Sequence, residues 1–176
     1  MSTETITKLA AAERQLDTAI TLWFSEADTI SIHTLTCSAY EIIRTTNRLQ
    51  KGHKDILYDS LRIKEEYREK WADALKQHYN FFKHATRDPS KTITFNPTIT
   101  EIFILCSIAG LELLGIKLNI TREAFNFWIY IHRPSLLAEE FKKLFINFLP
   151  VNSLREIKRI QRGEFFHSYK LFRSKP

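Results

Sequence analysis

The chain has 176 residues and a net charge of +6, with 44% hydrophobic and 26% charged residues. These values fit one globular domain that needs neither disulfides nor metals to fold, and they exclude wholesale disorder. Only four glycines are present, none in a cluster, so the sequence lacks a phosphate-cradling loop and we expect no nucleotide cofactor.

Three features of the sequence predict the cellular compartment of the protein. Cys37 and Cys106 lie far apart and form no CxxC pair, which is typical of a reduced cytoplasmic protein. The N-terminus has no basic stretch followed by an apolar run, so we expect no secretory signal. The longest apolar run, 102–116, is about five residues short of the roughly 20 that span a bilayer, and it contains Glu112. We therefore expect a cytoplasmic protein with no membrane partner.

Apolar residues at spacings of three and four predict helices in the N-terminal half. The first helix spans about 5–24 and the second about 31–49. The stretch 51–64 contains a glycine and is predicted as a loop. A third helix follows over 71–89, where a proline ends it, and 91–95 is predicted as extended loop. The apolar stripes comprise Leu9, Leu16, Ile20 and Trp23 in the first helix and Ile32, Leu35, Ala39 and Ile42 in the second.

The fourth and fifth predicted helices carry the most apolar residues. Thr98 and Glu101 fit a capping box that opens the fourth helix. That helix is apolar nearly all round, which predicts a position at the centre of a bundle. Thr121 is predicted to cap the fifth helix, which is rich in aromatic residues and stops at Pro134.

The remaining elements complete the predicted fold. Ser135 is predicted to cap a sixth helix that ends at Pro150, and a last helix is expected over 153–161. No repeat, linker or paired strand is evident. The sequence therefore predicts an all-α fold, a single-domain helical bundle of six to eight helices that covers 1–176.

The polar face of the third helix concentrates ionisable residues. Asn80 and His84 are four residues apart and share a face, and Lys83 and Arg87 flank them. An imidazole beside cations and an amide could bind a phosphate or act as the acid in phosphodiester cleavage. The alternative is a solvated face, since cations are favourable near a helix C-terminus.

Histidines and a cysteine elsewhere have simpler interpretations. His33 and Cys37 share a face with Tyr40, and a metal or thiol site there would need further ligands or an orienting group. We expect instead a packing face with hydrogen-bonded side chains, and no metal site. His78 and His132 lie on aromatic stripes and are expected in or near the core, each with a hydrogen bond.

Residues 151–176 form a basic amphipathic C-terminal segment that holds seven basic and two acidic side chains, hence +5 of the net charge. Arginine and lysine neutralise phosphates while aromatic rings stack on bases, so this composition suits single-stranded nucleic acid. An acidic protein is the alternative partner, and in the third interpretation Phe165, Tyr169 and Phe172 dock on the core. The candidate binding cations of the segment are Arg155, Lys158, Arg159 and Arg162, predicted as one helical stripe, and Lys170 and Arg173 beyond Gly163.

Several blocks resemble those of a largely uncharacterised family of small bacterial proteins. The blocks are SIHTLTCSAYEII, NFFKHATRDP, FNPTITEIFIL and FWIYIHRPSLL. The resemblance implies a cytoplasmic bacterial helical protein and assigns no reaction.

The chain is also distantly similar to the HEPN superfamily of helical nucleotide-handling domains. Their bundles dimerise, and active members use an R-x4-6-H motif as a metal-independent ribonuclease. The spacing occurs from Arg48 to His53 and from Arg162 to His167, each time with a glycine inside the motif.

Three functions follow as expectations. We favour a non-enzymatic helical domain that binds RNA or an RNA-handling protein. The alternative is a HEPN-type ribonuclease with His84 as its acid and base. The third is a structural homodimer that pairs through the aromatic fifth helix.

Overall fold

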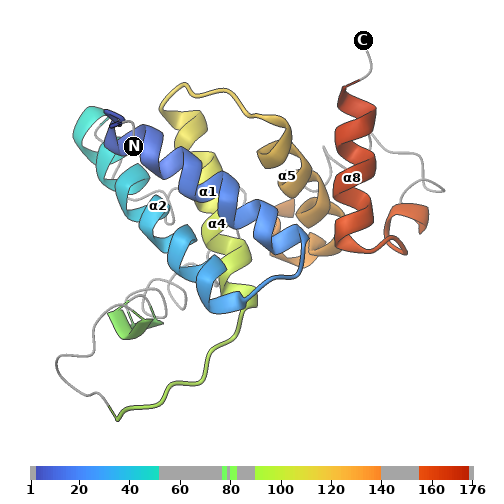
Figure 1. Cartoon of the computed structure of the whole chain (residues 1–176). Coiled ribbons are helices and arrows are strands. Elements are labelled where there is room, and N and C mark those ends of the chain that lie inside the picture. Colours follow the sequence, from blue (N-terminus) through green and yellow to red (C-terminus); the bar gives the residue numbers. More distant parts are fainter. Residues whose placement is uncertain (1–2, 52–76, 79, 83–89, 140–154, 175–176) are drawn as a thin grey trace.

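The computed structural model describes residues 3–51, 77–78, 80–82, 90–139 and 155–174 (Figure 1). Within these ranges the chain forms helices and no β-strand, and the predicted all-α bundle is confirmed. None of the described helices combines the length and the hydropathy needed to cross a membrane. The helices are α1 (Lys8–Phe24), α2 (Thr29–Lys51), α4 (Thr98–Leu113), α5 (Ile120–His132) and α8 (Arg162–Arg173), with a short 3-10 helix, η1 (Pro134–Leu136), after α5.

The first two helices form an antiparallel pair, and side-chain caps fix where each begins (Figure 1). The hydroxyl of Thr7 accepts a hydrogen bond of 3.1 Å from the amide of Ala10, so α1 begins at Lys8. The carboxylate of Asp28 accepts one of 2.7 Å from the amide of Ser31 and opens α2. Both predicted helices are confirmed, although α1 begins later and α2 begins earlier than expected.

Helix α4 lies at the centre of the bundle, as predicted, and almost every residue from Ile99 to Leu111 is buried. The side chain of Asn47 in α2 donates a hydrogen bond of 2.9 Å to the carbonyl oxygen of Gly110, which brings the two helices close together. The predicted capping box is wrong. Thr98 lies inside the first turn, and the side-chain oxygen of Asn96 accepts from its amide at 3.0 Å.

The predicted cap of α5 is also wrong by two residues. Asn119, not Thr121, caps the helix, and its side chain accepts a hydrogen bond of 3.0 Å from the amide of Arg122. The helix ends before Pro134, as predicted. Ser135 lies within η1 and therefore does not cap a sixth helix, most of which falls outside the described residues.

The C-terminal segment folds differently from the prediction. Residues 155–157 form a helical turn, and the chain then turns over 158–160. Gln161 is extended, with φ −71° and ψ 154°, and α8 begins at the next residue. Because of this break, the four predicted cations do not form one helical stripe. Gly163 lies inside α8 and does not interrupt it.

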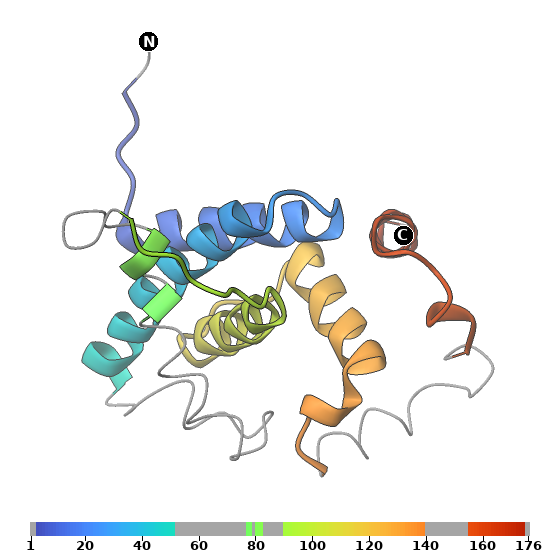
Figure 2. The same cartoon turned by 90° about the horizontal axis from the view of Figure 1, so that it is seen from below.

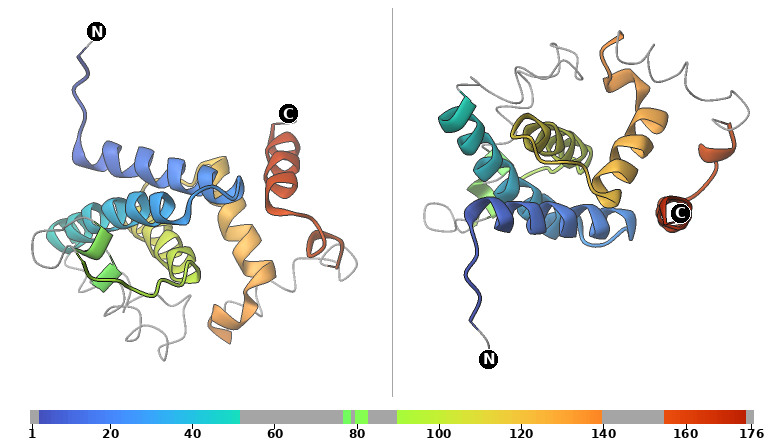
Figure 3. Two further views of the ribbon diagram at one scale, coloured as in Figure 1. Left: turned by 60° about the horizontal axis from the view of Figure 1, so that its bottom comes forward. Right: turned by 90° about the horizontal axis from the view of Figure 1, so that it is seen from above.

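Helix α8 stands at one end of the bundle, beside α5 and next to the C-terminal end of α1 (Figures 2 and 3). Its aromatic side chains explain this position. The ring of Phe166 stacks on that of Phe24 at a centroid distance of 4.3 Å, and Phe165 meets Trp128 at 5.1 Å. The extended Gln161 redirects the chain so that these rings can reach the core.

Candidate functional site: a pocket with a basic rim

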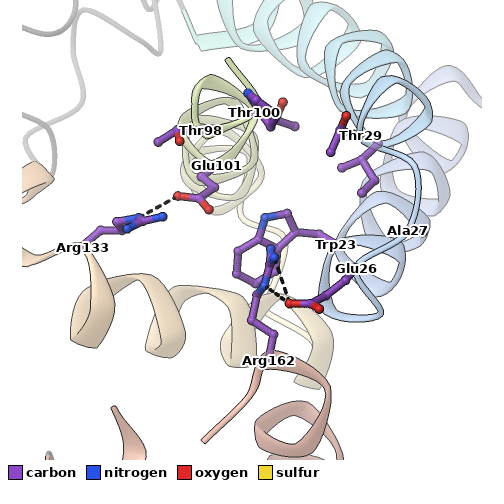
Figure 4. A pocket seen from close by; sticks show the side chains of 11 residues that line it. Trp23, Glu26, Ala27, Thr29, Thr98, Thr100, Glu101, Arg133 and Arg162 are labelled. Atoms are coloured by element: carbon purple, nitrogen blue, oxygen red, sulfur yellow. Dashed lines mark hydrogen bonds and ion pairs between the residues drawn. The ribbon is translucent and has the colours of Figure 1, made fainter. Parts of the chain in front are cut away.

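A pocket of about 340 Å³ opens where four parts of the chain meet (Figure 4). It lies between the first turn of α4, the turn that joins α1 to α2, the residue that follows α5 and the start of α8. Trp23, Ala27, Ile32 and Pro97 give it an apolar lining, and Thr29 and Thr98 add hydroxyl groups. Its size is near the lower end of the range for small-ligand sites. We call it the α4 pocket.

A buried acid and a half-exposed base form the first ion pair of the α4 pocket. Glu101 projects from the first turn of α4, and only 8% of its side chain is exposed. Arg133 caps the C-terminal end of α5, with 48% of its side chain exposed. Its Nε donates to Glu101 Oε2 at 3.1 Å. A buried carboxylate requires such a partner, so Glu101 holds this arginine at the pocket.

A second ion pair forms another wall of the pocket (Figure 4). Arg162, the first residue of α8, donates from Nε to Glu26 Oε1 at 3.1 Å. Its guanidinium carbon also lies 4.5 Å from the centroid of the Trp23 ring, a favourable cation–π distance. Glu26 has a φ of 54° in the turn between α1 and α2, and this backbone conformation places its carboxylate at the pocket.

The basic segment 155–162 approaches the pocket beside His132. This imidazole stacks on Trp128 with the ring centroids 3.6 Å apart, and its Nδ1 donates to the Trp128 carbonyl oxygen at 3.0 Å. Burial lowers the pKa of His132, and the positive charges of Lys158 and Arg133 lower it further, against the opposing effect of the carbonyl hydrogen bond. One cation of the basic segment and one of the pocket therefore both act electrostatically on this ring.

The predicted binding residues fall into three groups. Arg155, Lys158 and Arg159 are exposed. Arg162, Lys170 and Arg173 make contacts within the chain: Lys170 Nζ lies 4.2 Å from the centroid of the Phe166 ring, and Arg173 pairs with Glu123 at 3.1 Å. In the third-helix cluster, Asn80 is exposed, whereas Lys83, His84 and Arg87 lie outside the described residues.

The aromatic residues of α8 dock only in part as predicted. Phe165 is buried and Tyr169 is half-buried against it, which confirms docking for these two rings. Phe172 was expected to join them, but 72% of it is exposed. Phe166 is buried in its place because the helix turns that ring toward Phe24.

The His33 face is a packing face, as predicted. His33 is fully buried, with its Nδ1 2.9 Å from Thr100 Oγ1 and its Nε2 3.3 Å from Cys37 Sγ. Burial, aided by the electrostatic effect of His78, lowers the pKa of His33 to about 4. Nε2 of His78 donates to the Thr94 carbonyl oxygen at 3.2 Å, which confirms its expected hydrogen bond. Among the described residues, no group of three or more His, Cys, Asp or Glu side chains could hold a metal ion.

Sequence reasoning missed one buried charge cluster and both ion pairs of the pocket. Arg122 in α5 has only 2% of its side chain exposed and pairs with Asp17 at 2.8 Å and Glu13 at 3.0 Å, both in α1. A signal was present, since Arg122 lies three residues before Phe125 on the apolar face of its helix. Glu101 gave a similar signal, as one of two acids in a mostly apolar helix.

The α4 pocket combines guanidinium donors, carboxylate acceptors and hydroxyl groups with an apolar lining. These groups suit the recognition of a charged or polar ligand. Comparisons with known protein families, with characterised proteins and with solved structures find no match to this chain. Its function is therefore argued from the pocket and the charge around it.

Proposed function

We propose that the protein is a non-enzymatic helical domain that binds single-stranded RNA through the basic segment 155–162 and the adjoining part of α8. The observation that carries this proposal is the distribution of charge. Residues 151–176 contribute +5 of the net charge of +6, and the charges of Lys158 and Arg133 both act on His132. A phosphate backbone attracts clustered cations of this kind.

Exposure of the cations supports an electrostatic interface. Arg155, Lys158 and Arg159 are exposed in the turn before α8, where a strand can reach them without unfolding the domain. Phe172 projects from α8 with 72% of it exposed, one residue before Arg173. Exposed aromatic rings beside cations provide stacking for bases and neutralisation for phosphates.

The ribonuclease alternative depends on the third-helix cluster of Asn80, Lys83, His84 and Arg87. Cleavage would require His84 as the acid and base, and only Asn80 of this cluster lies among the described residues. The two motif matches lie elsewhere in the chain. The match from Arg48 to His53 ends outside the described residues, and the match from Arg162 to His167 falls within α8, where Arg162 pairs with Glu26 and stacks on Trp23. Neither match includes a residue of the third-helix cluster.

The homodimer alternative would pair two copies through the aromatic face of α5. In this chain Trp128 contacts Phe165 at a centroid distance of 5.1 Å, and Phe127 stacks on the same ring at 6.2 Å. Helix α8 thus covers part of that face. A second copy would have to displace α8, so we favour the RNA-binding function.

The test is binding of labelled single-stranded RNA to the purified protein across a salt series, with gel analysis of the RNA afterwards. We expect affinity to fall steeply with salt, by about 0.7 in log K per neutralised phosphate for each log unit of salt, with the RNA intact. Cleavage that disappears in His84→Ala would instead establish the ribonuclease. Absence of binding at low salt would refute both and point to an acidic protein partner.

A further inference from the structure

The proposed RNA interface does not explain why the protein has the α4 pocket. An interface formed by exposed cations needs no cavity, yet the α4 pocket is lined by two guanidinium groups that come from different elements. We propose that the α4 pocket binds a terminal phosphate monoester of a nucleotide, and that its source is the 5′-phosphorylated end of the bound RNA strand. The choice of source rests on the proposed function, whereas the phosphate chemistry does not.

Carboxylates hold both arginines of the pocket. Arg133 donates to Glu101 through its Nε, and its half-exposed side chain lines the pocket. Arg162 is fixed by Glu26 and by the Trp23 ring. Guanidinium groups bind phosphate oxygens through paired N–H donors, and carboxylates behind them fix their orientation.

The charges around the pocket favour an anion. Its two acids and two arginines balance each other, so the lining alone does not select an anion. The surroundings do, because three exposed cations precede Arg162 in the chain, and the charges of Lys158 and Arg133 both act on His132. An anion that follows the basic segment is therefore drawn toward the pocket.

The structure of the pocket limits the size of its ligand. The first turn of α4 borders the cavity, and its first three amides, those of Thr98, Ile99 and Thr100, already donate to Asn96 and Pro97. The Thr98 hydroxyl lines the cavity and is the hydrogen-bonding group that this turn offers. The volume of about 340 Å³ suits one nucleotide rather than a continuing strand. A strand end is the part of an RNA that fits.

The test compares one RNA sequence with a 5′-phosphate or a 5′-hydroxyl end, and adds free adenosine monophosphate as a competitor. The wild-type protein should bind the phosphorylated strand about tenfold more tightly. Arg133→Gln should remove this preference. Because that change leaves the buried Glu101 without its cation, a second variant is needed.

Thr29→Phe serves as that second variant, since it adds a ring to the pocket wall and alters no charge. It should abolish the preference for a 5′-phosphate and preserve binding of the 5′-hydroxyl strand. Thr18→Phe is the matched control: Thr18 is exposed on α1 and does not line the pocket, so the preference should persist. Thermal melting of each variant checks that it is folded.

The outcomes separate this proposal from the RNA-binding proposal. RNA binding with no preference for the phosphorylated end, and no competition by the monophosphate, would overturn the pocket site and leave RNA binding standing. Monophosphate binding that depends on Arg133 without any RNA binding would support the phosphate chemistry and overturn the strand end as its source. A preference that survives Thr29→Phe would place the phosphate elsewhere and refute the pocket.

Discussion

Arg122 and Arg173 both pair with acids on another helix, but in different surroundings. Arg122 joins α5 to α1 with 2% of its side chain exposed, and it binds Asp17 through two nitrogens and Glu13 through one of them. Arg173 joins α8 to Glu123 of α5 with 48% of its side chain exposed. Water therefore reaches the guanidinium of Arg173 and hardly reaches that of Arg122.

This difference in exposure separates arginines that stabilise the fold from arginines that can exchange one partner for another. Arg122 lies inside the packed bundle, where a lost partner leaves charge in poor contact with water. Arg162 and Arg173 lie at the two ends of α8, and their acids, Glu26 and Glu123, are 63% and 25% exposed in their side chains. A phosphate can compete for these two arginines at little cost to the fold, while apolar rings keep α8 in place.

The largest expected effect comes from the ring that links the two regions. Phe24 is 1% exposed and contacts Trp23 and Phe125 in the bundle as well as Phe165 and Phe166 in α8. Phe24→Ala should lower the free energy of unfolding by about 4 kcal/mol because it leaves a cavity at this junction. Chemical denaturation measures the loss. Phe172→Ala is the control and should change stability by less than about 0.5 kcal/mol.

Acid should destabilise the bundle through His33. Its pKa is about 4 in the folded protein and near 6.5 when unfolded, so the unfolded chain takes up a proton first as the pH falls. The stability that the neutral ring provides is complete above pH 6.5 and is lost progressively down to about pH 4, a change of roughly 3 kcal/mol.

The variant His33→Asn isolates this contribution, since its side chain can still reach Thr100 and does not titrate. The difference in unfolding free energy between wild type and variant should shrink as the pH falls from 6.5 to 4. A difference that stays constant over this range would show that His33 is not held neutral by the core.

Breaking the buried charge cluster should lower the free energy of unfolding by less than Phe24→Ala or the protonation of His33. Arg122→Met keeps the aliphatic length and removes the charge, and Asp17 and Glu13 lose their partner. Loss of one partner from a fully buried pair costs about 3–5 kcal/mol. These acids are 30% and 32% exposed in their side chains and regain some hydration. We therefore expect a loss of about 2 kcal/mol in denaturant unfolding, and a loss below about 0.5 kcal/mol would contradict a structural role.

The smallest effect should come from the exposed pair. Arg173→Gln should lower the free energy of unfolding by less than about 1 kcal/mol, because an exposed ion pair is weak and screened by salt. Near-ultraviolet circular dichroism of the tryptophan and phenylalanine bands should stay unchanged, since the rings hold α8. Loss of this signal would show that the ion pair, rather than Phe165 and Phe166, keeps the helix docked.

The sequence predicted the helices well because their apolar stripes are local patterns. It did not predict which residue caps each helix, because two residues with a similar preference for the capping position can lie close together in the sequence. Asn119 and Thr121 could each cap α5, and the choice is reinforced by Asp17, which accepts a hydrogen bond of 2.8 Å from Asn119 across 102 positions of sequence. Such a contact has no local signature. The last helix was predicted over 153–161, and the start of α8 at Arg162 was missed for the same reason, since Gln161 gives no turn signal and Phe24 receives the rings that follow.

The candidate site was predicted only in part. Charge counting identified the basic C-terminal segment and hence Arg162, but no spacing could join Glu101 to Arg133, 32 residues away, or Glu26 to Arg162, 136 residues away. Composition also could not tell which cations the fold engages. Lys170 and Arg173 looked equivalent to Arg155 in the sequence, and only the docked position of α8 separates them.

The most direct measurement is the salt dependence of RNA binding by two charge-matched triple variants. Arg155→Gln/Lys158→Gln/Arg159→Gln removes the exposed cations of the basic segment, and Lys8→Gln/Arg48→Gln/Lys117→Gln removes three exposed cations elsewhere. Three lost phosphate contacts should reduce the slope of log K against log salt by about 2 in the first variant and leave the second close to wild type. Equal slopes in the two variants would contradict the proposed RNA interface and show that the cations of the basic segment do not bind the phosphates of the RNA.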